Sequence, residues 1–190
     1  MWPEIRDYHL KRLDEALRKG EVDEGIIPVL SKINEFEEYV TRSSCYGRVS
    51  LAKEEGLIRK GRGKLLYRFH RPISIDDLYD IINSIDQGIL WMNIEGTIIH
   101  VACKDLGAAE KILDIAYRAG YEESSIYSIS RRGVTVEILL DEKFSIPIYM
   151  SGMGKLVSDN DIKLLLEYIH RRFYRIEKAK KNLINLLREL

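Results

Sequence analysis

The sequence is poor in cysteine and contains no long hydrophobic run. Cys45 and Cys103 are the only cysteines among 190 residues, which excludes a disulfide framework and a four-cysteine zinc site. The apolar runs 98–103 and 146–150 are far shorter than the roughly 20 residues that a membrane-spanning helix needs. The first residues lack the apolar segment of a signal peptide, so we expect none. These absences predict a cytoplasmic protein.

The sequence has no excess of charge of either sign. Its 30 Lys and Arg residues balance 30 Asp and Glu residues, so the formal net charge is zero. This balance argues against a histone-like nucleic-acid binder but is compatible with local basic patches. Hydrophobic residues make up 45% of the chain and charged residues 32%, enough apolar material for a packed core. The length favours one domain, or at most two small ones.

The hydrophobic periodicity predicts alternating helices and strands. We expect a hairpin across Glu95-Gly96 and a second one across 131–133, on either side of a central helix. The sequence therefore predicts an α/β fold of the α+β type, with a mixed, largely antiparallel sheet, helices packed on it and a long C-terminal helix. The expected helices are 4–19, 24–41, 74–84, 105–119 and 158–190, and the expected strands are 49–51, 65–69, 89–94, 97–103, 125–130, 134–140 and 146–150.

Two segments are locally basic. One carries six cations and no acid, with Tyr67, Phe69 and His70 among them, which suits phosphate binding with aromatic stacking on bases. The second basic segment is the long C-terminal helix. Instead of binding phosphates, this helix could build an oligomer. The alternative interpretation is that the first segment is an ordinary solvated loop and the second an ordinary charged helix face. The six cations are Arg59, Lys60, Arg62, Lys64, Arg68 and Arg71.

A cluster of small polar residues follows the second predicted helix. Ser43, Ser44 and Cys45 precede Gly47 and Arg48, in a segment that we expect to be a loop. Hydroxyl and amide donors beside a guanidinium suit a phosphate, a carboxylate or the end of an amino acid. The alternative is a turn from a helix into a strand, with Cys45 buried for structural reasons.

The histidines give no metal motif. His70 ends the basic segment and His100 lies inside a predicted strand, whereas His9 and His170 are expected at the surface. No spacing typical of zinc ligands occurs, so no metal is expected. Phosphate-binding glycine motifs, including the dinucleotide-binding GxGxxG pattern, are also missing from the sequence.

Several ordered blocks of the sequence form a recognisable pattern. The blocks are Thr41–Arg48, Phe69-His70-Arg71, Leu90-Trp91 with Ile99-His100-Val101, Gly120-Tyr121 with Ser124 and Ile126, and Val136-Glu137-Ile138. Together they resemble the tRNA methyltransferase family that acts third in wybutosine synthesis, and its archaeal members in particular. The resemblance covers roughly residues 5–185, and Ile89 and the segment 139–141 depart from the family pattern.

The resemblance implies a function. Such enzymes transfer a methyl group from S-adenosylmethionine to N4 of a 4-demethylwyosine-type tricyclic base at position 37 of phenylalanine tRNA. They are not Rossmann methyltransferases, so the missing GxGxxG pattern is no contradiction. The resemblance also implies a single methyltransferase-like domain over residues 1–190.

The resemblance also suggests roles for individual residues. His100 or His70 would accept the proton that leaves the base, and Ser43, Ser44 and Arg48 would hold the cofactor carboxylate or a tRNA phosphate. Further cofactor or substrate contacts would come from Cys45, Gly47, Trp91, Ser124 and Glu137, although Trp91 in a core and Glu137 paired within the sheet are equally compatible. The six cations and the C-terminal helix would bind the anticodon stem-loop.

Two alternatives from other functional classes remain. A noncatalytic tRNA-binding protein on the same scaffold would bind tRNA but not S-adenosylmethionine. A protein–protein interaction module using the long helix would form an oligomer and ignore RNA.

Overall fold

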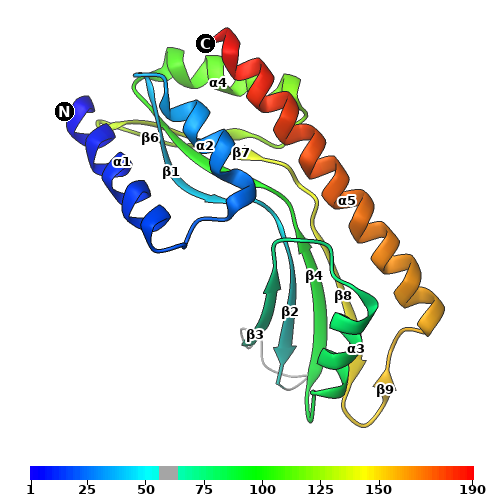
Figure 1. The fold of residues 1–190 in the computed structure, drawn as a ribbon. Helices are drawn as coiled ribbons and strands as arrows, with labels where there is room; N and C mark the ends of the chain where they lie inside the picture. The colour runs from blue at the N-terminus through cyan, green and yellow to red at the C-terminus, as the bar shows by residue number, and fades with distance from the viewer. Residues whose placement is uncertain (56–63) are drawn as a thin grey trace. The chain divides into compact units, whose positions relative to one another are not determined.

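The computed structural model describes residues 1–55 and 64–190, which form two compact units. Unit 1 comprises residues 1–46, 96–141 and 176–190, and unit 2 comprises residues 47–95 and 142–175. Each unit has its own sheet, and every strand pairing in the described chain is antiparallel (Figure 1). The predicted α+β class with a long C-terminal helix is confirmed. The single domain over residues 1–190 stays a prediction.

Unit 1 contains a four-stranded sheet in the order β1-β5-β7-β6. The strands are β1 (Tyr39–Cys45), β5 (Ile98–Cys103), β7 (Gly133–Leu139) and β6 (Ser125–Ser130). The helices are α1 (Trp2–Arg18), η1 (Glu24–Ile26), α2 (Ile27–Asn34), α4 (Leu106–Ala119), the last part of α5 (Asp159–Leu186) and η2 (Leu187–Glu189).

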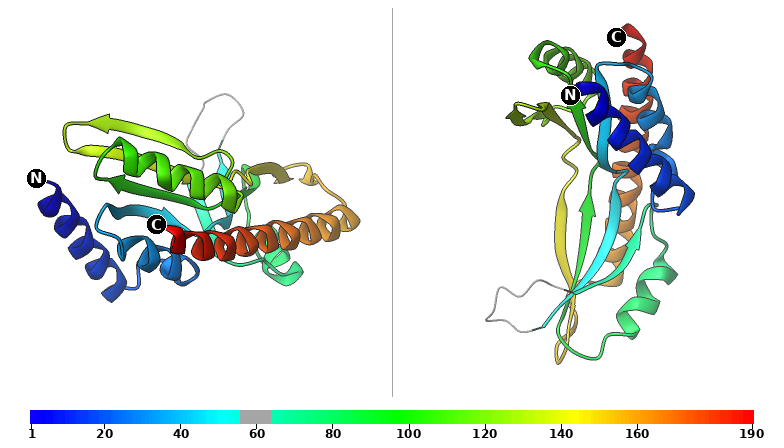
Figure 2. Two further views of the ribbon diagram at one scale, coloured as in Figure 1. Left: turned by 90° about the horizontal axis from the view of Figure 1, so that it is seen from above. Right: turned by 90° about the vertical axis from the view of Figure 1, so that its left-hand side faces the viewer.

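One face of this sheet is the core of unit 1. Ile99, Val101, Val136 and Ile138 alternate along β5 and β7 and are fully buried beneath the helices on that face. α2 packs on β1, and α4 lies along β7 and β5 (Figure 2). Asp105 caps α4 by accepting a hydrogen bond from the amide of Ala108 at 2.9 Å. The opposite face of the sheet is therefore left for other contacts.

Helix α1 stands beside β1 and leaves that opposite face partly open. The indole of Trp2 donates to the carbonyl of Glu37 at 2.8 Å, and Arg6 donates to the carbonyl of Asn34 at 2.7 Å. No residue of α1 is fully buried. α1 is thus anchored at its start and forms a wall of the cavities described below.

Unit 2 contains a five-stranded sheet in the order β3-β2-β4-β8-β9. Ser74 and Asp77 form a capping box at the start of its helix α3. Leu51 and Met92, paired across β2 and β4, are fully buried. The elements are β2 (Arg48–Glu54), β3 (Lys64–Phe69), α3 (Ile75–Asn83), β4 (Ile89–Glu95), β8 (Phe144–Met150), β9 (Gly154–Lys155) and the first part of α5.

The apolar stripe of α5 is buried along its length. Ile162, Ile169, Ile176 and Leu183 all have no exposed surface. This burial accounts for the helical periodicity without a second chain, so an oligomer built on α5 stays a prediction. No helix of the described ranges has both the length and the apolar composition to cross a membrane.

The predicted hairpin across Glu95-Gly96 is wrong. β4 pairs with β2 and β8, whereas β5 pairs with β1 and β7. Thr97, between them, is buried and donates to the carbonyl of Tyr46 at 2.6 Å. The segment therefore joins strands that belong to two different sheets and is not a hairpin turn.

The predicted helix 24–41 and the loop after it are also wrong. α2 ends at Asn34, whose side chain accepts from the amide of Thr41 and donates to its hydroxyl, both at 2.9 Å. Tyr39, Val40 and Thr41 are residues that favour strands. They begin β1, so Ser43, Ser44 and Cys45 lie on a strand of unit 1 rather than in a loop.

Candidate active site

Three neighbouring strands of unit 1 bring polar residues together in one row on the open sheet face. Ser43 of β1 lies opposite His100 of β5, and His100 lies opposite Glu137 of β7. Ser43 Oγ is 2.9 Å from His100 Nδ1, and His100 Nε2 is 2.9 Å from Glu137 Oε2. The pairing register alone therefore assembles a hydroxyl, an imidazole and a carboxylate, which we call the Ser-His-Glu row.

The two contacts in the row differ in quality. The Ser43–His100 contact meets hydrogen-bond geometry. His100 Nε2 is buried and close to Glu137 but is not aligned for a hydrogen bond with it. Catalytic hydrogen bonds are often misaligned in a protein without substrate and tighten when substrate binds.

A bulge in β1 brings Arg42 to the same face as Ser43. The register of β1 against β5 shifts between Thr41 and Ser43, so Arg42 is the extra residue. In a regular strand Arg42 and Ser43 would point to opposite faces. Here Arg42 Nη1 reaches across β5 and donates to Thr135 Oγ1 of β7 at 2.9 Å.

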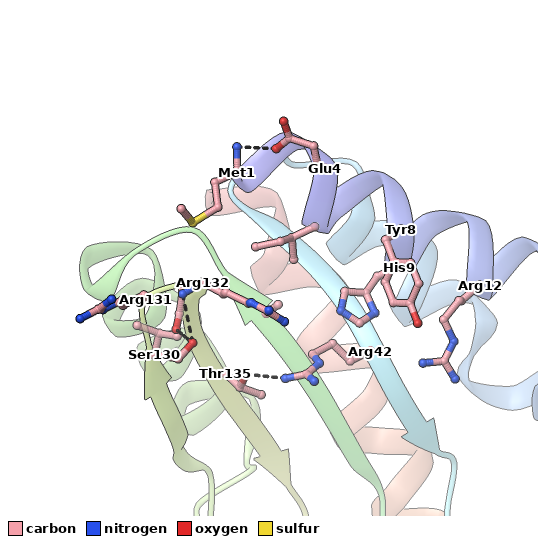
Figure 3. Close-up of a pocket in the computed structure, with 14 residues that line it drawn as sticks. Met1, Glu4, Tyr8, His9, Arg12, Arg42, Ser130, Arg131, Arg132 and Thr135 are labelled. Atoms are coloured by element: carbon pink, nitrogen blue, oxygen red, sulfur yellow. Dashed lines mark hydrogen bonds and ion pairs between the residues drawn. The ribbon is translucent and has the colours of Figure 1, made fainter.

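Two adjoining cavities lie on this face. The larger, of about 1140 Å³, is enclosed by α1, the open sheet face and the β6–β7 turn (Figure 3). The smaller, of about 300 Å³, is lined by Ser43, His100 and Tyr127. His9, Arg12, Arg42 and Thr135 line both. Ligand sites usually have about 300–1,000 Å³, so the two together have room for a nucleoside-sized ligand and a base.

The larger cavity is strongly cationic. Arg12 of α1 and Arg42 of β1 lie on one side, and Arg131 and Arg132 lie on the β6–β7 turn (Figure 3). Glu4 is the single acid in its lining, and its carboxylate is paired with the amino group of Met1. The cavity is thus suited to an anionic ligand.

His9 contributes an unsatisfied nitrogen to this site. Burial, followed by the nearby charges of Arg42 and Arg12, holds the pKa of His9 below its ordinary value. Its Nδ1 is buried with no hydrogen-bond partner in the described part of the chain. A buried polar atom of this kind is a contact point for a bound ligand. The expectation that His9 lies at the surface is wrong, because α1 turns it toward β1 (Figure 3).

The remaining candidates of unit 1 are not members of the row. Ser44 lines a third cavity of about 220 Å³, together with His9 and Arg42. Cys45 is half-buried at the end of β1. Ser124 is buried, and its hydroxyl donates to the carbonyl of Tyr121 at 2.7 Å and accepts from the amide of Leu139 at 3.0 Å. The hydroxyl of Ser124 is thereby engaged in holding the α4–β6 turn against β7.

The other candidates belong to unit 2. His70 Nδ1 lies 3.2 Å from the carbonyl of Gly47, which has a φ of 115°. Arg48 pairs with Glu95 at 2.6 Å. The indole of Trp91 donates to Glu54 Oε2 at 2.8 Å, so its polar group has a partner within the sheet.

The basic segment of unit 2 is described only in part. Lys64 and Arg68 are exposed on β3. Arg71 forms an ion pair with Asp77 at 2.9 Å, which holds the pKa of Asp77 well below its usual range. Arg59, Lys60 and Arg62 lie outside the described residues.

Sequence reasoning missed several residues of the site. Arg12, Arg131, Arg132 and Tyr127 line the two cavities, yet none was singled out. Two adjacent arginines in a predicted hairpin turn were a usable signal. The side of α1 that faces the cavity gave no such signal, because its residues have the spacing of an ordinary solvated helix face.

Comparison with known proteins now identifies the relationship. The family model described as Methyltransferase TYW3 matches residues 4–189. The chain belongs to the TYW3 methyltransferase family. The resemblance noted in the sequence is therefore confirmed.

Relatives in the TYW3 family match over nearly their whole length. A Methanocaldococcus jannaschii protein named tRNA(Phe) 7-((3-amino-3-carboxypropyl)-4-demethylwyosine(37)-N(4))-methyltransferase is 38% identical over 186 residues, which cover 95% of this chain and 94% of that protein. A Pyrococcus abyssi protein with the same name, numbered 1, is 36% identical over 178 residues, covering 94% and 91%. Among solved structures, the PH1069 protein from Pyrococcus horikoshii has a TM-score of 0.91 at 33% identity, covering 97% of this chain and 95% of that one.

Proposed function

We propose that this member of the TYW3 family transfers a methyl group from S-adenosylmethionine to N4 of the 4-demethylwyosine-type base at position 37 of phenylalanine tRNA. The observation that carries the proposal is the match to relatives named for this reaction over at least nine-tenths of both chains. Position 37 adjoins the anticodon, so the anticodon stem-loop is the part of the tRNA that reaches the site. A cytoplasmic location stays a prediction.

The cavities of unit 1 fit the methyl donor. The carboxylate of its amino-acid end matches the guanidinium groups of Arg42 and Arg12, because an arginine binds a carboxylate through two parallel hydrogen bonds. The unsatisfied Nδ1 of His9 adds a polar contact between them. Anchoring by Thr135 fixes the Arg42 guanidinium before any ligand arrives. Ser44 borders the same residues and extends this polar wall.

The Ser-His-Glu row removes the proton that the reaction releases. S-adenosylmethionine, when bound, supplies a methyl carbon whose bond to sulfur breaks as its bond to N4 forms. Ser43 Oγ accepts the N4 proton and passes its own proton to His100 Nδ1. Glu137 keeps the proton on Nε2 and stabilises the resulting imidazolium. His100 is therefore the catalytic base of the proposal.

The candidates of unit 2 have separate proposed roles. Lys64 and Arg68, which are exposed, bind the tRNA backbone together with the segment that contains Arg59, Lys60 and Arg62, because a sequence of clustered cations without acids suits phosphates. His70 and Arg71 are engaged with Gly47 and Asp77, and Arg48 with Glu95, so these residues shape unit 2 in this proposal. Trp91 and Ser124 have structural partners as well.

The proposal is tested with S-adenosylmethionine that carries a labelled methyl group. The full chain is incubated with this donor and with phenylalanine tRNA bearing the demethylated tricyclic base. Label in the tRNA supports methyl transfer. A noncatalytic tRNA-binding protein on the same scaffold would bind the tRNA, leave it unlabelled and fail to bind the donor in calorimetry.

A further inference from the structure

The β6–β7 turn places two arginines at the rim of the larger cavity. Arg131 and Arg132 are both exposed. The hydroxyl of Ser130 accepts from the amide of Arg132 and donates to the carbonyl of Gly133, both at 3.2 Å. Gly133 has a φ of +122°, and a Cβ there would meet the carbonyl oxygen of Cys103 at 2.6 Å. The backbone that carries the two arginines is therefore held by two hydrogen bonds of Ser130 and by the close approach of Gly133 to Cys103.

The two arginines also lack the acids that compensate most other arginines of this protein. Arg131 and Arg132 form no ion pair with any acid in residues 1–55 and 64–190. Arg12 and Arg42 form none either, nor do Arg6, Arg68 and Arg188 among the described residues, whereas seven other arginines are paired within their own unit. These paired arginines are Arg18, Arg48, Arg71, Arg118, Arg171, Arg172 and Arg175.

One carboxylate does not account for four guanidinium groups. The proposed carboxylate contact of the methyl donor occupies Arg42 and Arg12, on the α1 side of the cavity. The pair on the turn remains, with no ion-pair partner among the described residues, because Glu4 in the same cavity is paired with the amino group of Met1. An exposed pair of arginines without an ion-pair partner among the described residues is suited to binding a chain of phosphates.

Strand β6 connects this turn to the Ser-His-Glu row. The ring of Tyr127 lies 5.0 Å from the ring of His100, edge to face, and Tyr127 is 66% exposed. Arg131 lies four positions after Tyr127, a span of up to about 13 Å at the usual rise of a strand. A ligand that reaches His100 and also the turn must therefore extend well beyond one base. Every side chain of β6 is exposed, so the path between them is accessible.

We propose that Arg131 and Arg132 bind the phosphodiester backbone of the substrate RNA next to the target base, with Tyr127 as a stacking surface for a base between them and His100. This interaction surface belongs to unit 1 and is distinct from the basic strand of unit 2. The proposal rests on the proposed function, because that function makes the RNA a tRNA. Phosphate contacts would fix the strand so that base 37 enters the smaller cavity.

The test compares two double variants that lose the same charge. Arg131→Ala with Arg132→Ala removes the turn pair, and Arg18→Ala with Arg118→Ala removes two paired arginines elsewhere in unit 1. The dissociation constant for phenylalanine tRNA is measured by fluorescence anisotropy from about 50 to 200 mM salt. Each lost phosphate contact lowers the slope of log K against log salt by about 0.7–0.9.

For the alanine turn variant we expect the magnitude of the slope to fall by about 1.4–1.8 and the affinity for tRNA to fall at least about tenfold. The control variant should keep the wild-type slope and affinity. Arg131→Lys with Arg132→Lys should keep the slope, because the charges remain. An unchanged slope in the alanine turn variant, or an equal loss in the control, would overturn the inference. If the wild-type chain methylates tRNA while the turn variant binds it normally, only this inference fails. If the wild-type chain does not bind tRNA at all, the proposed function fails with it.

Discussion

Replacing Glu137 by glutamine should slow methyl transfer strongly without unfolding the protein. A carboxylate can only accept a hydrogen bond, so in the proposed mechanism the Glu137 carboxylate, 2.9 Å from His100 Nε2, favours the tautomer with its proton on Nε2 and leaves Nδ1 free to accept from Ser43. The amide of glutamine can donate to Nε2, which favours the other tautomer and blocks proton acceptance at Nδ1. The shape of the side chain is conserved, and residue 137 is only half-buried.

The size of the effect follows from the role of the row. General-base catalysis is worth about 10²–10⁴ in rate, or roughly 2.7–5.4 kcal/mol of activation free energy at 1.36 kcal/mol per tenfold. We therefore expect Glu137→Gln to lower the single-turnover rate by about 10²–10⁴, with a near-normal dissociation constant for S-adenosylmethionine. Single-turnover conditions are needed so that product release does not mask the chemical step.

The matched variants are His100→Ala and the double variant. If Glu137 acts through His100, the double variant should be no slower than His100→Ala alone, because the two residues work as a unit. A Glu137→Gln protein that keeps more than about a third of the wild-type single-turnover rate would refute the assignment of the row.

Two further outcomes concern stability. Ser124→Ala leaves the amide of Leu139 without its partner, so the free energy of unfolding should fall by about 1–3 kcal/mol, seen as a lower midpoint in urea; an unchanged midpoint would mean that water replaces the hydroxyl. The pKa of His9 is lowered in the folded state, so below about pH 6.5 the unfolded chain binds a proton at His9 more readily than the folded chain does. The free energy of unfolding therefore decreases as the pH is lowered through this range. His9→Gln should flatten that part of the stability curve, measured by urea unfolding at several pH values, and an unaltered curve would contradict the assigned burial.

The class of the fold could be predicted from local sequence patterns, but its strand pairing could not. The β6–β7 hairpin follows from two apolar strands around 131–133, and it is present. β4 and β5 look like a hairpin too, because they are adjacent and joined by Glu95-Gly96. Their real partners are distant in sequence, and the hydrogen bond from the buried Thr97 hydroxyl to the carbonyl of Tyr46 gives no local signal.

The site shows the same limit. Ser43, His100 and Glu137 were each singled out in the sequence, yet only the pairing of β1, β5 and β7 shows that they meet. Arg42 joins them because of a bulge, which no residue pattern in β1 announces. The arginines of α1 and of the β6–β7 turn act together only through tertiary structure, so their common cavity was beyond sequence reasoning.

The central claim is tested most directly by identifying the nucleoside that the protein makes. Phenylalanine tRNA with the demethylated tricyclic base is incubated with the full chain and S-adenosylmethionine, digested, and analysed by mass spectrometry with fragmentation. The account predicts one added methyl group, located at N4 of the base at position 37, and no methyl on tRNA that carries guanosine there. Unchanged tricyclic base, or a methyl group elsewhere in the tRNA, would contradict it.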